Sequence, residues 1–124
     1  MELKKDKRTC ILIVDDSAVT RELLASMFNP SLFHVEKVAD VKSAIKVLAI
    51  KKFDIVLMDY YMPDVDGIKG CSFIKSNSNQ QVSDVKVILI TAHKERDLVI
   101  RAAKAKADSF LVKPFSKKDL LAKI

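Results

Sequence analysis

The 124-residue sequence has no tryptophan, two glycines, three prolines and two cysteines. Cys10 and Cys71 lack the paired spacing of disulfide frameworks and cysteine-based metal sites, so we expect ordinary buried thiols. No apolar run approaches the roughly 18 residues of a membrane span. The charged start, MELKKDKRTC, lacks the apolar centre of a secretory signal. These absences predict a soluble, cytoplasmic protein with no membrane partner.

The formal net charge is +6, and 49% of the residues are hydrophobic. The length fits one domain with one sizeable core, since domains most often have about 100 to 150 residues. The lysines are scattered with few aromatic residues between them, which is typical of solvated helix faces rather than of a nucleic-acid surface. We expect no direct nucleic-acid binding by this domain. Residues 1–9 are interpreted as a charged tail and residues 10–124 as the domain.

Continuous apolar runs alternate with stretches of helical period, a pattern typical of a parallel sheet covered by helices. The runs predict five strands, at residues 10–14, 33–38, 54–58, 85–90 and 109–112. The first, third and fourth are apolar throughout, as in central strands buried on both faces. The second carries His34, Glu36 and Lys37 and is expected at an edge. The predicted fold class is α/β, a single doubly wound five-stranded parallel sheet.

Helices are expected where apolar residues recur at intervals of three and four. The sets are Val19, Leu23 and Met27; Val41, Ala44, Ile45 and Leu48; and Leu98, Ala102 and Ala105. Another helix is expected at about 66–76, followed by a polar loop, SNSNQQVSD. Ser17 and Ser116 are suited to cap the first and last helices. The last, SKKDLLAKI, is short, so either the chain was cut there or more protein follows.

Polar side chains stand where four of the five predicted strands end. In such sheets ligands bind beyond the carboxyl ends of the strands, so these residues should meet. Several carboxylates in one pocket repel each other, and a divalent cation relieves the repulsion. An oxygen-only set favours Mg²⁺ (or Mn²⁺) over zinc. With a lysine and a hydroxyl nearby, the pattern indicates a carboxylate that accepts a phosphoryl group. The residues are Asp15, Asp16, Asp59, Thr91 and Lys113.

Each of these residues also has an ordinary structural explanation. Aspartates after strands often cap the next helix, threonine is common at strand ends, and a lysine before proline is often plain surface. Five such residues in register are poorly explained by separate structural roles.

The motifs ILIVDDS, MDYYMPDVDG, ILITAH and FLVKPF together resemble the receiver domain of two-component response regulators over about residues 10–124. The resemblance implies the strand order 2-1-3-4-5 with about five helices on both faces. It implies a signalling module rather than an enzyme, in which Asp59 takes a phosphoryl group from a histidine kinase or phosphotransfer protein and the output face then switches. Slow self-dephosphorylation is implied as well.

The resemblance also assigns roles to individual residues. Asp16, Asp59 and the backbone carbonyl of Tyr61 would ligate Mg²⁺, with Asp15 acting mainly through water. Thr91 and Lys113 would each bind a phosphoryl oxygen. The resemblance further implies a cis peptide bond before Pro114, which would help to aim Lys113. It also implies that Gly67 allows the tight loop that carries the carbonyl of Tyr61.

Some positions are specific to this chain. Phe110 stands at the switch-aromatic position, where core packing and a switch role are both open. Tyr61 and His93 flank the path to Asp59, where bulk would slow hydrolysis; a solvent-facing loop residue is the other interpretation of His93. Lys106 and Val41 stand where glycine is frequent in the family, so those turns are expected to be shaped differently.

Partners and alternatives follow from the same motifs. An output domain or downstream protein is expected, and a homodimer through the helix before strand five, strand five and the last helix is a further expectation. Because the chain starts at a methionine shortly before strand one, we expect this domain to lead its polypeptide. A receiver fold that only binds proteins is one alternative. An aspartyl-phosphate phosphohydrolase is another, although such enzymes usually carry an acid where Tyr61 stands.

Overall fold

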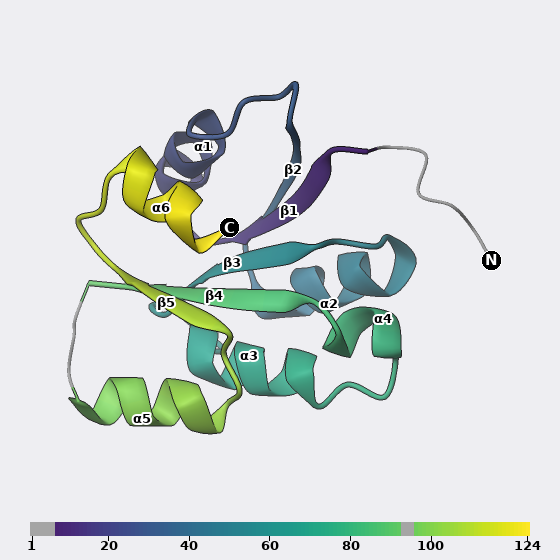
Figure 1. Cartoon of the computed structure of the whole chain (residues 1–124). Coiled ribbons are helices and arrows are strands. Elements are labelled where there is room, and N and C mark those ends of the chain that lie inside the picture. The colour runs from purple at the N-terminus through teal and green to yellow at the C-terminus, as the bar shows by residue number, and fades with distance from the viewer. Residues whose placement is uncertain (1–6, 93–95) are drawn as a thin grey trace.

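One sheet of five parallel strands organises the molecule, for which the computed structural model describes residues 7–92 and 96–124. The strand order is β2-β1-β3-β4-β5, as Figure 1 shows. This confirms the predicted fold class and the strand order implied by the resemblance. The strands are β1 Thr9–Val14, β2 Phe33–Val38, β3 Ile55–Asp59, β4 Lys86–Thr91 and β5 Ser109–Val112.

Helices cover both faces of the sheet (Figure 1). In the part of the chain that the structure describes there are six, one more than expected: α1 Ala18–Ser26, α2 Val41–Ile50, α3 Gly67–Lys75, α4 Gln80–Ser83, α5 Arg96–Lys104 and α6 Lys117–Lys123. Helices α1 and α6 pack on one face and α2 to α5 on the other. None of these helices is long and apolar enough to cross a membrane.

The central strands are buried on both faces because their side chains alternate between two cores. Ile11 and Ile13 of β1 belong to the core under α1 and α6, whereas Leu12 and Val14 belong to the core under α2 to α5. All four are fully buried, which gives the sheet a rigid centre. The polar strand β2 lies at the edge, as its sequence predicted.

Two strands end one residue later than the sequence predicted. Asp59 pairs with Ile90, and Thr91 pairs with Val112, so Asp59 and Thr91 are the last residues of β3 and β4. Both are buried. Asp54, which was predicted to begin β3, lies before it and accepts a hydrogen bond from the backbone of Cys10.

Helix α1 is confirmed, but two of its three periodic residues do not face the core, whereas Met27 packs against it. Val19 is 79% exposed and Leu23 is 59% exposed, while Leu24 and Phe28 are buried. The intervals of three and four gave the right element and the wrong face, because a second apolar set lies one position along the same helix. The Val41 and Leu98 sets do face the core, as Val41, Ala44, Leu48, Leu98, Ala102 and Ala105 are buried.

The segment predicted as a polar loop after α3 contains the short helix α4. The side chain of Asn79 caps it by accepting from the N–H of Gln81 at 3.0 Å. Val82 is completely buried, and the Gln81 amide donates to the carbonyl of Leu48 at 3.0 Å. One buried valine and one cap are enough for a helical turn here, which is too little pattern for a sequence to reveal.

The ends of α5 and α6 show how local chemistry fixes the turns. Ser116 caps α6 in a reciprocal capping box with Asp119, as expected for Ser116. After α5, Lys106 has φ 65°. The N–H groups of Lys106 and Ala107 donate to the carbonyls of Ala103 and Ala102 at 3.0 and 3.1 Å, the pattern of a Schellman turn. The lysine therefore takes the left-handed backbone that glycine prefers, and the expected change of turn shape is wrong.

Candidate functional site

The sheet brings Asp15, Asp16 and Asp59 together at its carboxyl end. Asp59 ends β3, and Val14, the residue before Asp15, pairs with Met58, the residue before Asp59. One carboxylate oxygen from each of the three residues lies within 4.8 Å of the others. Adjacent parallel strands in register deliver these groups to one place, although the sequence separates them widely.

Asp15 is held rigidly at this edge. It is buried, and its Oδ1 accepts a hydrogen bond from the N–H of Ser17 at 2.9 Å. The side chain of Ser17 caps α1 by accepting from the N–H of Thr20 at 3.2 Å, which confirms the expected cap. Arg21 donates to the carbonyl oxygen of Asp15 at 2.7 Å. The sequence analysis did not single out Arg21. Its position one turn into the helix after the acidic pair could have indicated a contact with that pair.

Two of the three carboxyl groups are electrostatically strained. Burial raises the pKa of Asp15, and the hydrogen bond from Ser17 and the charge of Lys113 offset this only in part. Burial also raises the pKa of Asp59, against the opposing charge of Lys113, and Asp15 adds repulsion. Asp16 is exposed, so the cluster opens to solvent. A cation entering there would replace the missing positive charge.

Thr91 is the last residue of β4, the strand beside β3, and Lys113 directly follows β5, the strand beside β4. The Nζ of Lys113 lies 3.3 Å from Oδ1 of Asp59, so the two side chains form an ion pair. The side chain of Lys113 is 35% exposed. The N–H of Lys113 donates to the carbonyl oxygen of Thr91 at 2.7 Å, which ties the ends of β4 and β5 together. The peptide bond between Lys113 and Pro114 is cis, as the resemblance implied.

Gly67 is required by close approach and not by an unusual φ. No glycine among the described residues has positive φ. A Cβ on Gly67 would lie 2.4 Å from the carbonyl oxygen of Asp59 and 2.9 Å from Cα of Tyr60, both backbone atoms. The N–H of Gly67 donates to the carbonyl oxygen of Tyr60 at 2.9 Å. The expected tight loop is present, but its physical cause is the packing of α3 directly onto the strand that carries Asp59.

Two tyrosines follow Asp59 at the mouth of the site. Tyr61 is 72% exposed, whereas Tyr60 is half-buried. Their rings meet edge to face, with centroids 5.6 Å apart and an interplanar angle of 82°. The hydroxyl of Tyr60 accepts a hydrogen bond from Arg101 of α5 at 3.4 Å. His93, the other residue predicted to flank the path to Asp59, lies outside the described residues.

Phe110 is a residue of β5 and lies next to α5. It is half-buried against the core under α2 to α5 and lines a cavity of about 170 Å³ together with Val99, Ala102 and Ala103. The packing role is therefore real. The cavity leaves room beside the ring, so the switch role stays a prediction.

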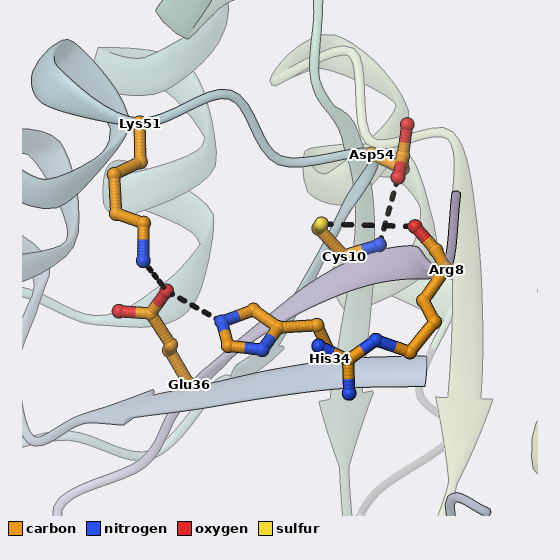
Figure 2. A network of polar contacts seen from close by, with 6 residues as sticks. All are labelled: Arg8, Cys10, His34, Glu36, Lys51 and Asp54. Atoms are coloured by element: carbon orange, nitrogen blue, oxygen red, sulfur yellow. Dashed lines mark hydrogen bonds and ion pairs between the residues drawn. The ribbon is translucent and has the colours of Figure 1, made fainter. Parts of the chain in front are cut away.

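A second set of polar contacts lies away from this site, toward the amino ends of the strands. Figure 2 shows Lys51 and His34 both reaching the carboxylate of Glu36, with the histidine at 2.9 Å, and Asp54 accepting from the N–H of Cys10 at 2.7 Å. Burial alone would raise the pKa of Glu36, but the hydrogen bonds from Lys51 and His34 lower it. These side chains are paired with each other or with the backbone, so their contacts do not indicate a ligand site.

The same is true of Lys75 and Asp108. The Nζ of Lys75 lies 2.6 Å from Oδ2 of Asp108 and donates to the carbonyl oxygen of Val85 at 2.8 Å. The N–H of Val87 donates to the same carboxylate at 2.8 Å. Burial raises the pKa of Asp108, but Lys75 outweighs it and the pKa is lowered. Both cysteines are buried, as predicted, and burial raises the pKa of Cys71 to about 11.

Known proteins are similar to this chain in sequence. The phosphate regulon transcriptional regulatory protein PhoB of Pseudomonas aeruginosa is 31% identical over 92% of this chain and 49% of its own length. The transcriptional regulatory protein PdtaR of Mycobacterium tuberculosis is 37% identical over 92% of this chain and 54% of its own length. The chain thus spans about half the length of the curated relatives it matches.

Solved structures agree on the fold. The chemotaxis protein CheY4 of Vibrio cholerae has a TM-score of 0.85 at 23% identity, with 93% of this chain and 94% of that chain covered. The signal receiver domain of a signal transduction histidine kinase from Syntrophus aciditrophicus has a TM-score of 0.81 at 28% identity, with coverage of 92% and 85%. The family model of the response regulator receiver domain matches residues 11–124, and the chain belongs to this family.

Proposed function

We propose that this receiver domain accepts a phosphoryl group on Asp59, in a Mg²⁺-dependent reaction, from a phosphohistidine of a sensor kinase or a phosphotransfer protein. The observation that carries the proposal is the convergence of three carboxylates and one lysine at the same end of the sheet. Structural roles explain each residue singly, but not their meeting at one edge of the sheet, where burial raises the pKa of two of the carboxyl groups.

The residues fit a magnesium ion. Asp15, Asp16 and Asp59 offer oxygen atoms close enough to share one cation, and the set contains no cysteine or histidine. Asp16 and Asp59 would ligate directly, together with the carbonyl oxygen of Tyr61, and Asp15 mainly through water. The bound ion would offset the negative charge of the phosphoryl oxygens.

The chain's own residues account for the remaining chemistry. An oxygen of the Asp59 carboxylate forms a bond to phosphorus while the phosphorus–nitrogen bond of the donor imidazole breaks. The histidine leaves as a neutral imidazole, because its other ring nitrogen already carries a proton. Lys113, already 3.3 Å from Asp59, would pair with one phosphoryl oxygen. Thr91 would donate its hydroxyl to another. The rigid central strand fixes the nucleophile in line with the donor.

The phosphoryl group would then change the output face. It carries about two negative charges and new acceptor oxygens, which one arrangement of the loop after Thr91 satisfies better than another. Phe110 would turn inward beside the cavity that it lines between β5 and α5. Its ring has no hydroxyl, so no hydrogen bond locks the inward state.

Access to Asp59 would set how long the phosphoryl group survives. Tyr61 lies two residues after the acceptor and is not buried in the core, and its bulk would slow the approach of water to the acyl phosphate. His93 would act from the other side of the path.

Partners and the wider polypeptide are part of the proposal. PhoB and PdtaR are transcriptional regulators about twice the length of the matched segment, which supports an output domain attached to, or acted on by, this one. A homodimer would form through α5, β5 and α6. A phosphohydrolase is not favoured, because Tyr61 stands where the second acid is needed. A receiver that works by binding alone is not favoured either, because the acidic cluster and lysine are complete.

The direct test is phosphorylation in vitro. The protein is incubated with Mg²⁺ and a small-molecule phosphodonor, and intact mass spectrometry follows the gain of a single phosphoryl group. Asp59→Asn should abolish that gain, whereas Asp64→Asn, which removes an exposed carboxylate from the same loop, should not. Phosphorylation that persists in Asp59→Asn would refute the assignment of the acceptor.

A further inference from the structure

Tyr60 connects the phosphoacceptor strand to helix α5. Its N–H donates to the carbonyl oxygen of Ile90 at 2.7 Å, and its own carbonyl oxygen accepts from Gly67 at 2.9 Å. Its ring packs against the core under α2 to α5. Its hydroxyl accepts from Nη1 of Arg101 at 3.4 Å. Both the backbone and the side chain of Tyr60 are therefore fixed.

Arg101 is suited to hold this contact from the helix side. It lies in the last turn of α5 and is exposed. Asp97, one turn earlier on α5, and Asp66, which caps α3, also attract its guanidinium. An i, i+4 pair with the acid first is the favourable order on a helix. Arg101 thus links α5 to the residue after the phosphoacceptor, with two acids near enough to favour its charge.

Tyr61 depends on Tyr60 for its orientation. The two rings meet edge to face at 5.6 Å, an arrangement that aromatic pairs prefer. Tyr61 is 72% exposed, so solvent leaves its ring free to turn unless this neighbour restrains it. Any movement of the Tyr60 ring therefore reaches Tyr61.

We infer that Arg101 and Tyr60 are positioning residues that orient the ring of Tyr61, two residues after Asp59, and so let helix α5 set the lifetime of the phosphoryl group. The inference rests on the proposed function of Asp59 and deepens it. A protein that binds the exposed side of α5 and takes Arg101 as its own hydrogen-bond donor would release Tyr60 and shorten that lifetime.

The test begins without phosphorylation. The chain has two tyrosines, and both belong to this contact, so NMR of protein with ¹³C-labelled tyrosine rings reports on it alone. Arg101→Ala should shift the ring signals of both tyrosines. Lys104→Ala removes an exposed charge from the same helix and should leave them in place. Unchanged signals in Arg101→Ala would overturn the inference.

The second measurement is the rate at which phosphoryl is lost after the donor is removed, well below the melting temperature of every variant. Tyr60→Phe and Arg101→Ala should each speed the loss about two- to fivefold, since a solvent-exposed hydrogen bond is worth at most about 1 kcal/mol. The double variant should be no faster than either single one. Arg101→Lys, which keeps a donor, should restore part of the lifetime.

The outcomes separate this inference from the proposed function. Additive effects, or unchanged loss rates in both single variants, would overturn the link between α5 and the lifetime while leaving Asp59 as acceptor. A wild-type protein that takes no phosphoryl group would overturn both the function and the lifetime claim. The tyrosine signals would then still show whether the contact itself exists.

Discussion

At the carboxyl end of the sheet, burial raises the pKa of Asp15 and Asp59, whereas at the amino end a lysine lowers the pKa of Asp108 despite burial. The first end gathers three carboxylates around one partly exposed lysine. The second pairs Glu36, Asp54 and Asp108 with cations or backbone N–H groups. We call the carboxyl end unfinished because its buried carboxyl groups lack enough nearby positive charge. We call the amino end satisfied because these acids are paired.

The difference identifies which end binds something. Acids that serve stability are expected to be paired in the folded protein, as Asp108 is with Lys75. Acids that are held close together and left short of positive charge lower stability, and folds keep such groups where they are used. The contrast predicts that neutralising an acid should raise stability at the carboxyl end and lower it at the amino end.

The largest effect is expected at Gly67. Gly67→Ala places a methyl group against the carbonyl oxygen of Asp59 at 2.4 Å, and backbone atoms cannot move aside cheaply. We expect a loss of about 1–3 kcal/mol in the free energy of unfolding, measured by urea denaturation, together with loss of Mg²⁺ binding.

Gly70→Ala is the comparison for this change. Its new methyl group meets the side chains of Val41 and Met58 at 2.6 and 2.8 Å, and alanine favours the helix. It should destabilise less and leave Mg²⁺ binding intact. Equal losses of metal binding would show that Gly67 acts through general packing of α3 and not through the loop beside Asp59.

At the satisfied end, Lys75→Met should destabilise the protein. The substitution removes the ion pair with Asp108 and the hydrogen bond to Val85, from a lysine whose side chain is only 14% exposed. A loss of about 1–2 kcal/mol is expected by urea denaturation at neutral pH. Lys69→Met, on the exposed side of the same helix, should change the free energy of unfolding little; a similar loss there would point to helix α3 as a whole.

At the unfinished end, Asp59→Asn should stabilise the metal-free protein by an amount on the order of 1 kcal/mol. Folding raises the pKa of Asp59, so its charged form opposes folding. That penalty is absent below the unfolded value near 4 and grows as the pH rises through the raised folded value. Denaturation curves of the two proteins should therefore agree in acid and diverge toward neutral pH.

Asp108→Asn is the matched variant for the pH series. Its pKa is lowered by folding, so its charge stabilises the protein above the unfolded value and this contribution is lost as the pH falls through the folded value. The variant should be less stable than the wild type at neutral pH and converge with it in acid. If both asparagine variants shifted stability in the same direction, the contrast between the two ends would be wrong.

The smallest effect is expected at Lys106, which carries strain at the otherwise satisfied end. Lys106→Gly should stabilise by about 0.5–1 kcal/mol, because the left-handed φ of 65° is unfavourable for a side chain with a Cβ. Thermal unfolding gives the measurement. Lys106→Ala removes the same charge but keeps the Cβ; a matching gain in that variant would assign the effect to charge.

The sequence by itself determined the fold class and which residues stand at strand ends. Apolar runs that alternate with helical periods leave few topologies, since parallel strands need crossovers of one hand. The residues Asp15, Asp16, Asp59, Thr91 and Lys113 were identifiable because strand ends meet at one edge of such a sheet. The faces of the helices were less certain: α1 turned Val19 and Leu23 to solvent because two apolar sets share the helix.

Only the tertiary structure decided the pKa shifts and the close contacts between elements at the site. Whether a carboxyl group has a raised or lowered pKa depends on burial and on partners distant in sequence, as Asp59 and Asp108 show. The reason for Gly67 is a contact across elements, with the backbone of Asp59. The Arg101 contact with Tyr60 spans 41 positions, and no local pattern encodes it. Local sequence chooses the elements, but the charge balance and close approaches exist only once those elements pack.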